Sequence, residues 1–264
     1  MKILTQNSTI PMLLIACVSL LASPAMADGL TAQQIVDKSL ERNKFGFQNA
    51  IAGITLKLIS KRGSERVREV EIKSIERDGL GKSLVRFHAP ADVAGTGFLL
   101  IEKENADDDQ YLYLPALGKV KRITGSQRNQ RFMGTDLTYA DMESRDLKNS
   151  SVTRKADEKL GGNDTFVIEA VPNDGSDSQY SKTVSWIHKK SFVPLKVDFY
   201  DKRGKLLKTL KVRRLEKKEG NWISTDSWIK NVQKKTQTFM IVNDINFKAK
   251  LDDSQFTERT LTEG

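Results

Sequence analysis

Cysteine is almost absent from this sequence, because Cys17 is the only one among the 264 residues. It lies in an apolar stretch from Ile10 to Leu21, and Ala25-Met26-Ala27 follows with the small-x-small pattern of a signal-peptidase site. The stretch is too short for a permanent membrane anchor. We therefore predict that residues 1–27 are a cleaved signal peptide. The remaining residues 28–264 contain no cysteine, which excludes stabilisation by disulfides.

The segment Leu14-Ile15-Ala16-Cys17 supports a second interpretation, because it is similar to a lipobox. In that case the chain would be an envelope-anchored lipoprotein acylated at Cys17. The apolar stretch continues past Cys17 to a good conventional cleavage site, which favours the secreted form.

Patterns typical of catalytic and metal sites are also missing. The only histidines, His88 and His188, lie far apart and in no metal-ligand spacing. The chain has no G-x-S-x-G motif, and Gly95-Thr96-Gly97 lacks the third glycine of a dinucleotide-binding loop. We therefore expect no catalytic residue, no metal and no cofactor, and we predict that the protein is not an enzyme.

Charge is plentiful and mostly positive, with 43 Lys and Arg against 34 Asp and Glu. A basic exported protein is expected to meet anionic lipids or an acidic partner surface rather than nucleic acid. Lys and Arg residues gather in two stretches. These stretches form either a solvated face or a surface that docks on anionic lipids or on an acidic partner. The stretches contain Lys119, Lys121, Arg122, Arg128 and Arg131, and then Lys205, Lys208, Lys211, Arg213, Arg214, Lys217 and Lys218.

Hydrophobic periodicity predicts one short helix followed by a mainly β domain. Thr31 and Gln34 have the spacing of a capping box, and apolar residues recur at helical spacing up to about Asn43. From Ala50 onward the period is two, and turn signals such as Asp78-Gly79 separate many short strands. Without long helices between them, these strands predict an antiparallel sheet that curls into a sandwich or barrel.

An apolar face of this sheet either forms an ordinary core or lines a cavity, since both need the same alternation. The candidate cavity residues are Ile54, Leu56, Leu58, Phe98, Tyr111, Tyr113 and Trp186. The polar stretch 124–142 is predicted to be a loop that leads into a short helix near Tyr139. Its apolar members would cover such a cavity as a lid, and the tentative lid residues are Phe132, Met133, Leu137 and Tyr139.

Three compact phrases carry a family resemblance. They are PADVAGTGFLL from Pro90, YLYLPALGKVKRI from Tyr111 and FMGTDLTYADM from Phe132. Together with VPLKVDFYDKRGKL from Val193, they resemble the LolA-like family of outer-membrane lipoprotein-sorting proteins over essentially all of residues 28–264, in a longer and less characterised branch.

The resemblance implies a mainly β fold: a single antiparallel sheet curled into an incomplete, half-open barrel, with short helices covering the concave face. It implies a periplasmic carrier that binds acyl chains of a lipoprotein or lipid and moves them toward the outer membrane. Its partners would include an outer-membrane acceptor. Members of this branch are often associated with inner-membrane exporters of the resistance-nodulation-division type, so an exporter accessory without free cargo is the alternative function.

Overall fold

The computed structural model describes residues 29–42, 49–104, 106–143, 147 and 149–263. The chain divides at Leu30 into two units, and the second, Thr31–Gly264, contains every described helix and strand. The predicted signal peptide and Cys17 lie outside the described residues. None of the described helices is long and apolar enough to cross a membrane.

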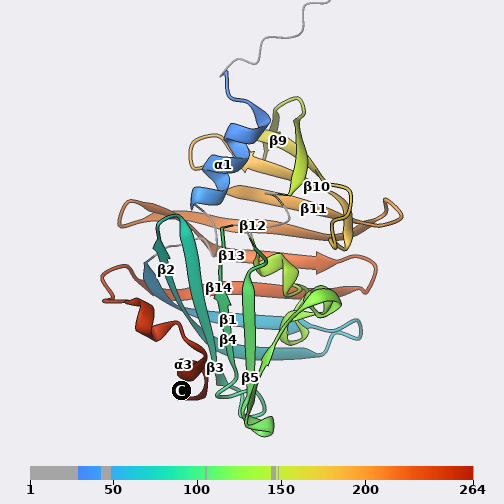
Figure 1. Ribbon diagram of the computed structural model, residues 1–264. Helices are drawn as coiled ribbons and strands as arrows, with labels where there is room; N and C mark the ends of the chain where they lie inside the picture. Colours follow the sequence, from blue (N-terminus) through green and yellow to red (C-terminus); the bar gives the residue numbers. More distant parts are fainter. Residues whose placement is uncertain (1–28, 43–48, 105, 144–146, 148, 264) are drawn as a thin grey trace, which may run out of the picture. The chain divides into compact units, whose positions relative to one another are not determined.

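The second unit is built on a 14-stranded sheet in which neighbouring strands are antiparallel (Figure 1). The order along the sheet is β6-β5-β4-β3-β2-β1-β14-β13-β12-β11-β10-β9-β7, and β8 pairs with β9. The sheet is not closed into a barrel, which confirms the fold class expected from the sequence. One ladder, between β1 and β14, joins the half built from β1–β6 to the half built from β7–β14.

The strands alternate between buried and more exposed residues, as the sequence period predicts. Those of the first half are β1 (Ala50–Ile59), β2 (Glu65–Arg77), β3 (Leu80–Ala89), β4 (Gly97–Ile101), β5 (Asp109–Leu114) and β6 (Lys119–Arg122). Those of the second half are β7 (Ser150–Arg154), β8 (Glu158–Leu160), β9 (Asn163–Pro172), β10 (Tyr180–His188), β11 (Pro194–Asp201), β12 (Leu206–Lys218), β13 (Asn221–Asn231) and β14 (Thr236–Asn246).

Helical segments are short. The first is α1 (Ala32–Arg42), which contacts β7 and β9. The predicted capping box is present: the Gln34 amide donates to Thr31 Oγ1 at 3.2 Å and the Thr31 amide donates to Gln34 Oε1 at 2.9 Å. The other segments are η1 (Pro115–Leu117), η2 (Gly125–Asn129), η3 (Phe132–Gly134), η4 (Ala140–Met142), η5 (Asp253–Gln255) and α3 (Glu258–Thr262).

The turn between β2 and β3 confirms a second local prediction. Asp78 and Gly79 have φ angles of 52° and 76°, both in the left-handed region. Two-residue hairpins need such angles because their twist then matches that of the strands, and Asp-Gly supplies them at low cost.

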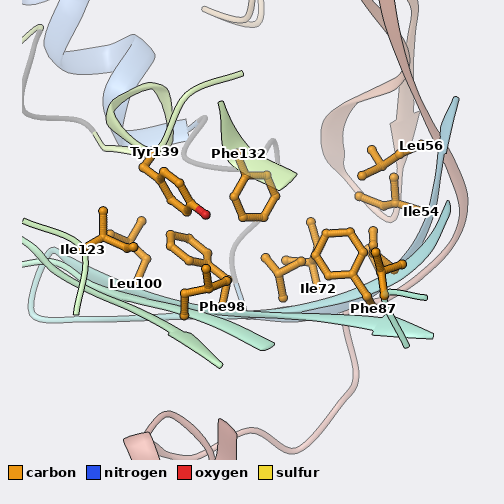
Figure 2. Close-up of a cluster of buried hydrophobic side chains, with 14 of the residues drawn as sticks. Ile54, Leu56, Ile72, Phe87, Phe98, Leu100, Ile123, Phe132 and Tyr139 are labelled. Atoms are coloured by element: carbon orange, nitrogen blue, oxygen red, sulfur yellow. The ribbon is translucent and has the colours of Figure 1, made fainter. Parts of the chain in front are cut away.

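The two faces of the first half of the sheet carry separate apolar clusters. We call the face that carries Ile54, Leu56 and Phe98 the inner face, and Figure 2 shows the sheet bending around this cluster. The outer face carries Leu99, which packs with Phe256 and Leu261 of the C-terminal segment. Strand β4 is therefore buried on both sides, as its uninterrupted apolar sequence predicts.

The C-terminal segment was not predicted as a helix, yet it is closely fitted to β4. Leu261 of α3 is fully buried, and its carbonyl accepts a hydrogen bond from Arg86 Nη1 at 2.7 Å. A Cβ added to Gly97 would lie 2.8 Å from the Leu261 side chain, so the glycine permits this approach. At five residues, α3 is too short to form by its own propensity and depends on this packing.

We predict that Leu261→Ala lowers the free energy of unfolding by about 2–4 kcal/mol, because it leaves a cavity between α3 and the sheet. Urea unfolding followed by circular dichroism measures this. Leu117→Ala is the matched control, since Leu117 is 66% exposed and its loss should change stability by less than about 0.5 kcal/mol. Equal effects of the two substitutions would mean that the C-terminal segment adds nothing to the fold.

Candidate functional site

The inner face holds a largely apolar cavity of about 260 Å³. The first half of the sheet contributes residues from β1, β2 and β3, and the second half contributes residues from β11 to β14. The segment 131–142, which we call the cover segment, adds Phe132, Leu137 and Met142. The predicted cavity residues Ile54 and Leu56 line this cavity, and Leu58 and Phe98 belong to the same buried cluster.

A second cavity of about 190 Å³ lies on the inner face of the other half of the sheet. Helix α1 contributes Val36 and Ser39, and β9, β10 and β11 supply most of the rest. Both cavities are lined by Leu137 and Asp141 of the cover segment and by Pro194 and Leu210 of the sheet, so they are neighbouring compartments.

Three predicted cavity residues lie elsewhere. Tyr111 and Tyr113 of β5 pack on the outer-face cluster that the C-terminal segment covers. Trp186 of β10 is opposite Lys196 and donates through Nε1 to Glu158 at 2.8 Å, whereas its neighbours Ser185 and Ile187 line the second cavity. The prediction placed them wrongly because alternation divides the residues of a strand into two sets, one on each face of the sheet. It does not show which of the two faces is the inner one.

The cover segment is part of the core rather than a loose lid. Phe132 is 2% exposed, and its ring centroid lies 5.1 Å from that of Phe98 and 5.5 Å from that of Tyr139 (Figure 2). Burial raises the pKa of the Tyr139 hydroxyl. Met133 and Leu137 are only partly buried. The four predicted lid residues therefore do lie over the inner face, but Phe132 and Tyr139 also anchor its main cluster.

The backbone of the cover segment is fixed at its tip by Arg68 of β2. Met133 and Gly134 both have left-handed φ angles, of 47° and 78°, and the Met133 carbonyl accepts a hydrogen bond from Arg68 Nη1. The same guanidinium lies 5.8 Å from the centroid of the Phe87 ring. Burial is the main cause of the lowered pKa of Arg68.

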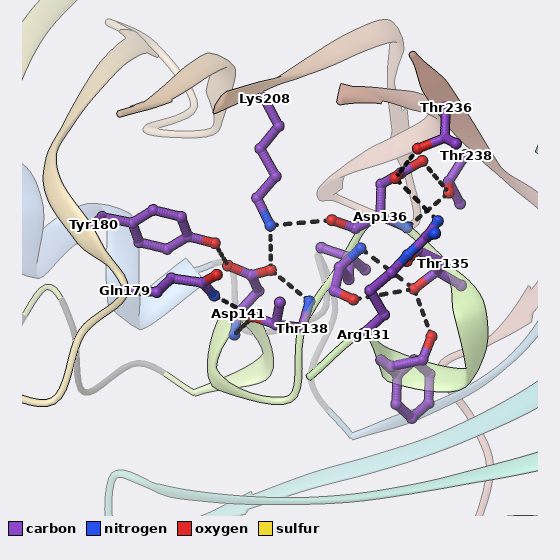
Figure 3. Close-up of polar contacts among 12 residues, drawn as sticks. Arg131, Thr135, Asp136, Thr138, Asp141, Gln179, Tyr180, Lys208, Thr236 and Thr238 are labelled. Carbon is purple, nitrogen blue, oxygen red and sulfur yellow. Dashed lines mark hydrogen bonds and ion pairs between the residues drawn. The ribbon is translucent and has the colours of Figure 1, made fainter. Parts of the chain in front are cut away.

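A polar network fixes the middle of the cover segment to the second half of the sheet (Figure 3). The Asp136 carboxylate accepts hydrogen bonds from Thr236 and Thr238 of β14, at 2.5 and 3.0 Å, and pairs with Arg131 at 3.1 Å. The Asp136 amide donates to Thr238 Oγ1 at 2.9 Å. The side chain of Asp136 is completely buried, so these partners supply the compensation that a buried carboxylate needs.

Lys208 of β12 extends this network at the boundary of the two cavities (Figure 3). Its ammonium lies 2.5 Å from the Asp141 carboxylate and donates to the Asp136 carbonyl at 3.0 Å. Tyr180 of β10 donates to the other Asp141 oxygen at 2.6 Å. The side chains of Lys208 and Asp141 are 2% and 4% exposed, so this is a buried ion pair.

Sequence analysis placed Lys208 and Arg128 among residues of a solvated or docking surface, and both are buried. Arg128 lies 3.3 Å from Glu143 and 3.1 Å from Asp107. A signal for Lys208 was present, because it stands in the same alternation phase as Leu210, whose side chain lines both cavities. A lysine in the apolar phase of a strand indicates a buried cation that needs a partner, although not which one.

The arrangement suits containment of an apolar molecule. The carboxylates of the cover segment are paired with Arg131, with Lys208 and with hydroxyl groups of the sheet, which leaves mostly aliphatic and aromatic side chains along the cavity walls. Within the described ranges, no group of three or more His, Cys, Asp or Glu side chains is placed to hold a metal ion. Apolar surface of this kind binds by removing a ligand's apolar area from water.

Proteins of known structure are similar to this chain in sequence and in fold. A family model described as an uncharacterized protein matches residues 79–263. A domain described as outer membrane lipoprotein-sorting, from Vibrio parahaemolyticus, is 34% identical with a TM-score of 0.79, over 88% of this chain and 99% of that one. A DUF1329 family protein from Desulfovibrio piger is 28% identical with a TM-score of 0.78, again over 88% and 99%.

A LolA superfamily protein from Nitrosomonas europaea has the same fold, with a TM-score of 0.68 at 20% identity, over 88% of this chain and 99% of that one. No protein of curated function matches this chain. The resemblance found in the sequence phrases therefore extends over most of the chain. The chain belongs to the LolA-like family of outer-membrane lipoprotein-sorting proteins.

Proposed function

We propose that this protein is a periplasmic carrier that holds acyl chains of a lipoprotein or lipid in its inner-face cavities and moves them toward the outer membrane. The proposal includes no catalytic step. The observation that carries it is the pair of neighbouring, mostly apolar cavities separated by one cover segment. Membership of the family supports the same function.

Cavity size supports a role for movement of the cover segment. Pockets for small molecules generally measure about 300–1,000 Å³. Each cavity is smaller than this, at about 260 and 190 Å³, whereas together they reach about 450 Å³. Displacing Leu137 and Asp141, which border both, would join them into one apolar channel. Acyl burial at about 0.8 kcal/mol per methylene then supplies the affinity.

The first test is mass spectrometry of molecules that co-purify with the protein in the absence of detergent, combined with titration of a fluorescent fatty acid. We expect a stoichiometric acylated species and saturable probe binding. An empty protein that also fails to bind the probe would contradict the proposal and favour the exporter-accessory function.

Two substitutions on β14 test whether the probe binds in the first cavity. Val242 lines the first cavity, so Val242→Phe should weaken probe binding at least about tenfold by occupying its space. Ile241 is adjacent in sequence, 37% exposed and absent from that lining, so Ile241→Phe should leave affinity unchanged. Equal affinity of the two variants would place the probe outside the cavity.

Within the cover segment, we expect Leu137 and Phe132 to separate binding from stability. Leu137→Ala removes a partly buried wall between the two cavities and joins them, so probe affinity should rise while the free energy of unfolding falls by less than about 2 kcal/mol. Phe132→Ala removes a buried ring and should cost about 3–5 kcal/mol of stability. The opposite ranking in urea unfolding would show that Phe132 is not part of the core.

Lys208 should control how firmly the cover segment is held. Lys208→Met leaves the buried Asp141 carboxylate without its cation, and we expect a loss of about 3–5 kcal/mol in unfolding free energy and faster probe entry in stopped-flow. The double variant Lys208→Met/Asp141→Leu removes both charges and should recover much of that stability. Additive losses would mean that the pair is not coupled.

A further inference from the structure

A row of basic and aromatic side chains crosses the outer face of the second half of the sheet and ends at β1 of the first half. Its members are directly opposite one another in neighbouring strands, from β10 through β14 to β1. Adjacent strands are about 4.8 Å apart, so the row extends about 24 Å. In order, this outer row consists of Trp186, Lys196, Lys211, Trp228, Phe239 and Lys57.

Cations lie over the rings of this row. The Lys196 ammonium is 3.9 Å from the Trp186 ring centroid, and the Arg213 guanidinium is 5.2 Å from that of Phe239. The aromatic rings are partly buried, whereas Lys211 and Arg213 are exposed. Lys196 is paired with Asp198 at 2.7 Å, so the positive groups that this face presents outward are chiefly Lys211 and Arg213, with aromatic surface directly beneath them.

The middle of the row borders an open hollow of about 680 Å³ on the sheet surface. Its lining includes Lys211, Arg213, Trp228 and Phe239, and Leu160 of β8 stands at its margin. In the described part of the chain, no acidic side chain pairs with Lys211. Arg213 has a partner in Asp226, at 3.6 Å.

The chain's net charge is concentrated in the same strands. Residues 194–246, which contain β11–β14, have 13 Lys and Arg against 6 Asp and Glu, a formal charge of +7 out of +9 for the whole sequence. Only one of these cations, Lys208, is buried on the inner face. Four of the six members of the outer row thus lie within these positively charged strands.

The two halves of the outer face differ in what covers them. In the first half, Tyr111, Tyr113 and Leu99 are packed under Phe256 and Leu261. The principal contacts of the described α-helices are with β4, β5, β6, β7 and β9, and not with the strands that carry most of the outer row. Neither described α-helix therefore packs over the basic and aromatic half of the outer face.

We propose that the outer row docks the protein on an anionic lipid bilayer surface. Lys and Arg gain about 1 kcal/mol each near such a surface, and Trp is the residue that typically sits at headgroup depth. The breadth of the row across six strands fits a plane better than it fits a single peptide segment. This inference concerns a different face from the cavities and does not depend on a bound acyl chain.

The test is co-sedimentation of the purified protein with vesicles of phosphatidylcholine alone or with 30% phosphatidylglycerol, at two salt concentrations. We expect binding only to the anionic vesicles, weakened by salt. Lys230 of β13 is also exposed on this face, with its ammonium 6.0 Å from the Trp228 ring centroid. In Lys211→Gln/Arg213→Gln/Lys230→Gln, affinity should fall about 100-fold, at roughly fivefold per charge removed.

A control variant with the same loss of charge shows whether the location matters. Lys119, Lys121 and Lys250 are exposed and lie outside β11–β14, so Lys119→Gln/Lys121→Gln/Lys250→Gln should keep most of the affinity. Binding that is equal for neutral and anionic vesicles, or an equal loss in both triple variants, would overturn the proposal. Both variants should bind the fluorescent fatty acid as the parent does, which separates this result from failure of the carrier function.

Trp228 provides a second, independent measurement. The chain has three tryptophans, so Trp186→Phe/Trp222→Phe leaves Trp228 as the single reporter. Anionic vesicles should shift its fluorescence to shorter wavelength as the ring enters the interface. Emission unchanged at saturating lipid would overturn the proposed orientation, including for a protein that binds vesicles through another surface.

Discussion

The pairing of β1 with β14 is the constraint on which the rest of this structure depends. Every other ladder on the main path of the sheet joins strands that are close in the chain, whereas this one brings the first strand against the last. It makes one continuous inner face from two separate series of hairpins. The first cavity is lined from both series, so it exists only because this ladder forms. Closure of so long a loop costs chain entropy, which the register of nine residue pairs and the apolar burial behind them must offset.

The cover segment combines two kinds of attachment that have different consequences. Phe132 and Tyr139 contribute to the main apolar cluster, so removing them weakens the fold as a whole. Asp136 and Asp141 are held by Thr238 and Lys208 through directional contacts that are either made or broken. A segment attached in this way can be held firmly closed and still open in one discrete step. The reason is that buried polar contacts stabilise the closed state much less once water reaches them. A carrier needs both properties, since it must exclude water from its cargo and later release it.

The same sheet presents different surfaces on its two sides because successive side chains of a strand point to opposite faces. On β12 this places Lys208 at the cavities and Lys211 in the outer row. On β14 it places Thr238 against the cover segment and Phe239 beneath Arg213. Alternate positions of a few strands thus form the apolar cavity lining on one face and the basic outer row on the other. The proposed membrane contact would bring the protein to a bilayer without exposing the cavity lining.

The sequence by itself determined what depends on neighbours in the chain. The capping box of α1, the Asp78-Gly79 turn, the two-sided burial of β4 and the family resemblance could all be inferred from short segments. Only the tertiary structure decided which side of each strand faces the cavities, because alternation fixes the phase of a strand but not its orientation relative to distant strands. It therefore moved Tyr111, Tyr113 and Trp186 to the outer face and Lys208 to the inner one. The threonine partners of Asp136 on β14 lie about 100 residues away in sequence, and no local pattern could have named them.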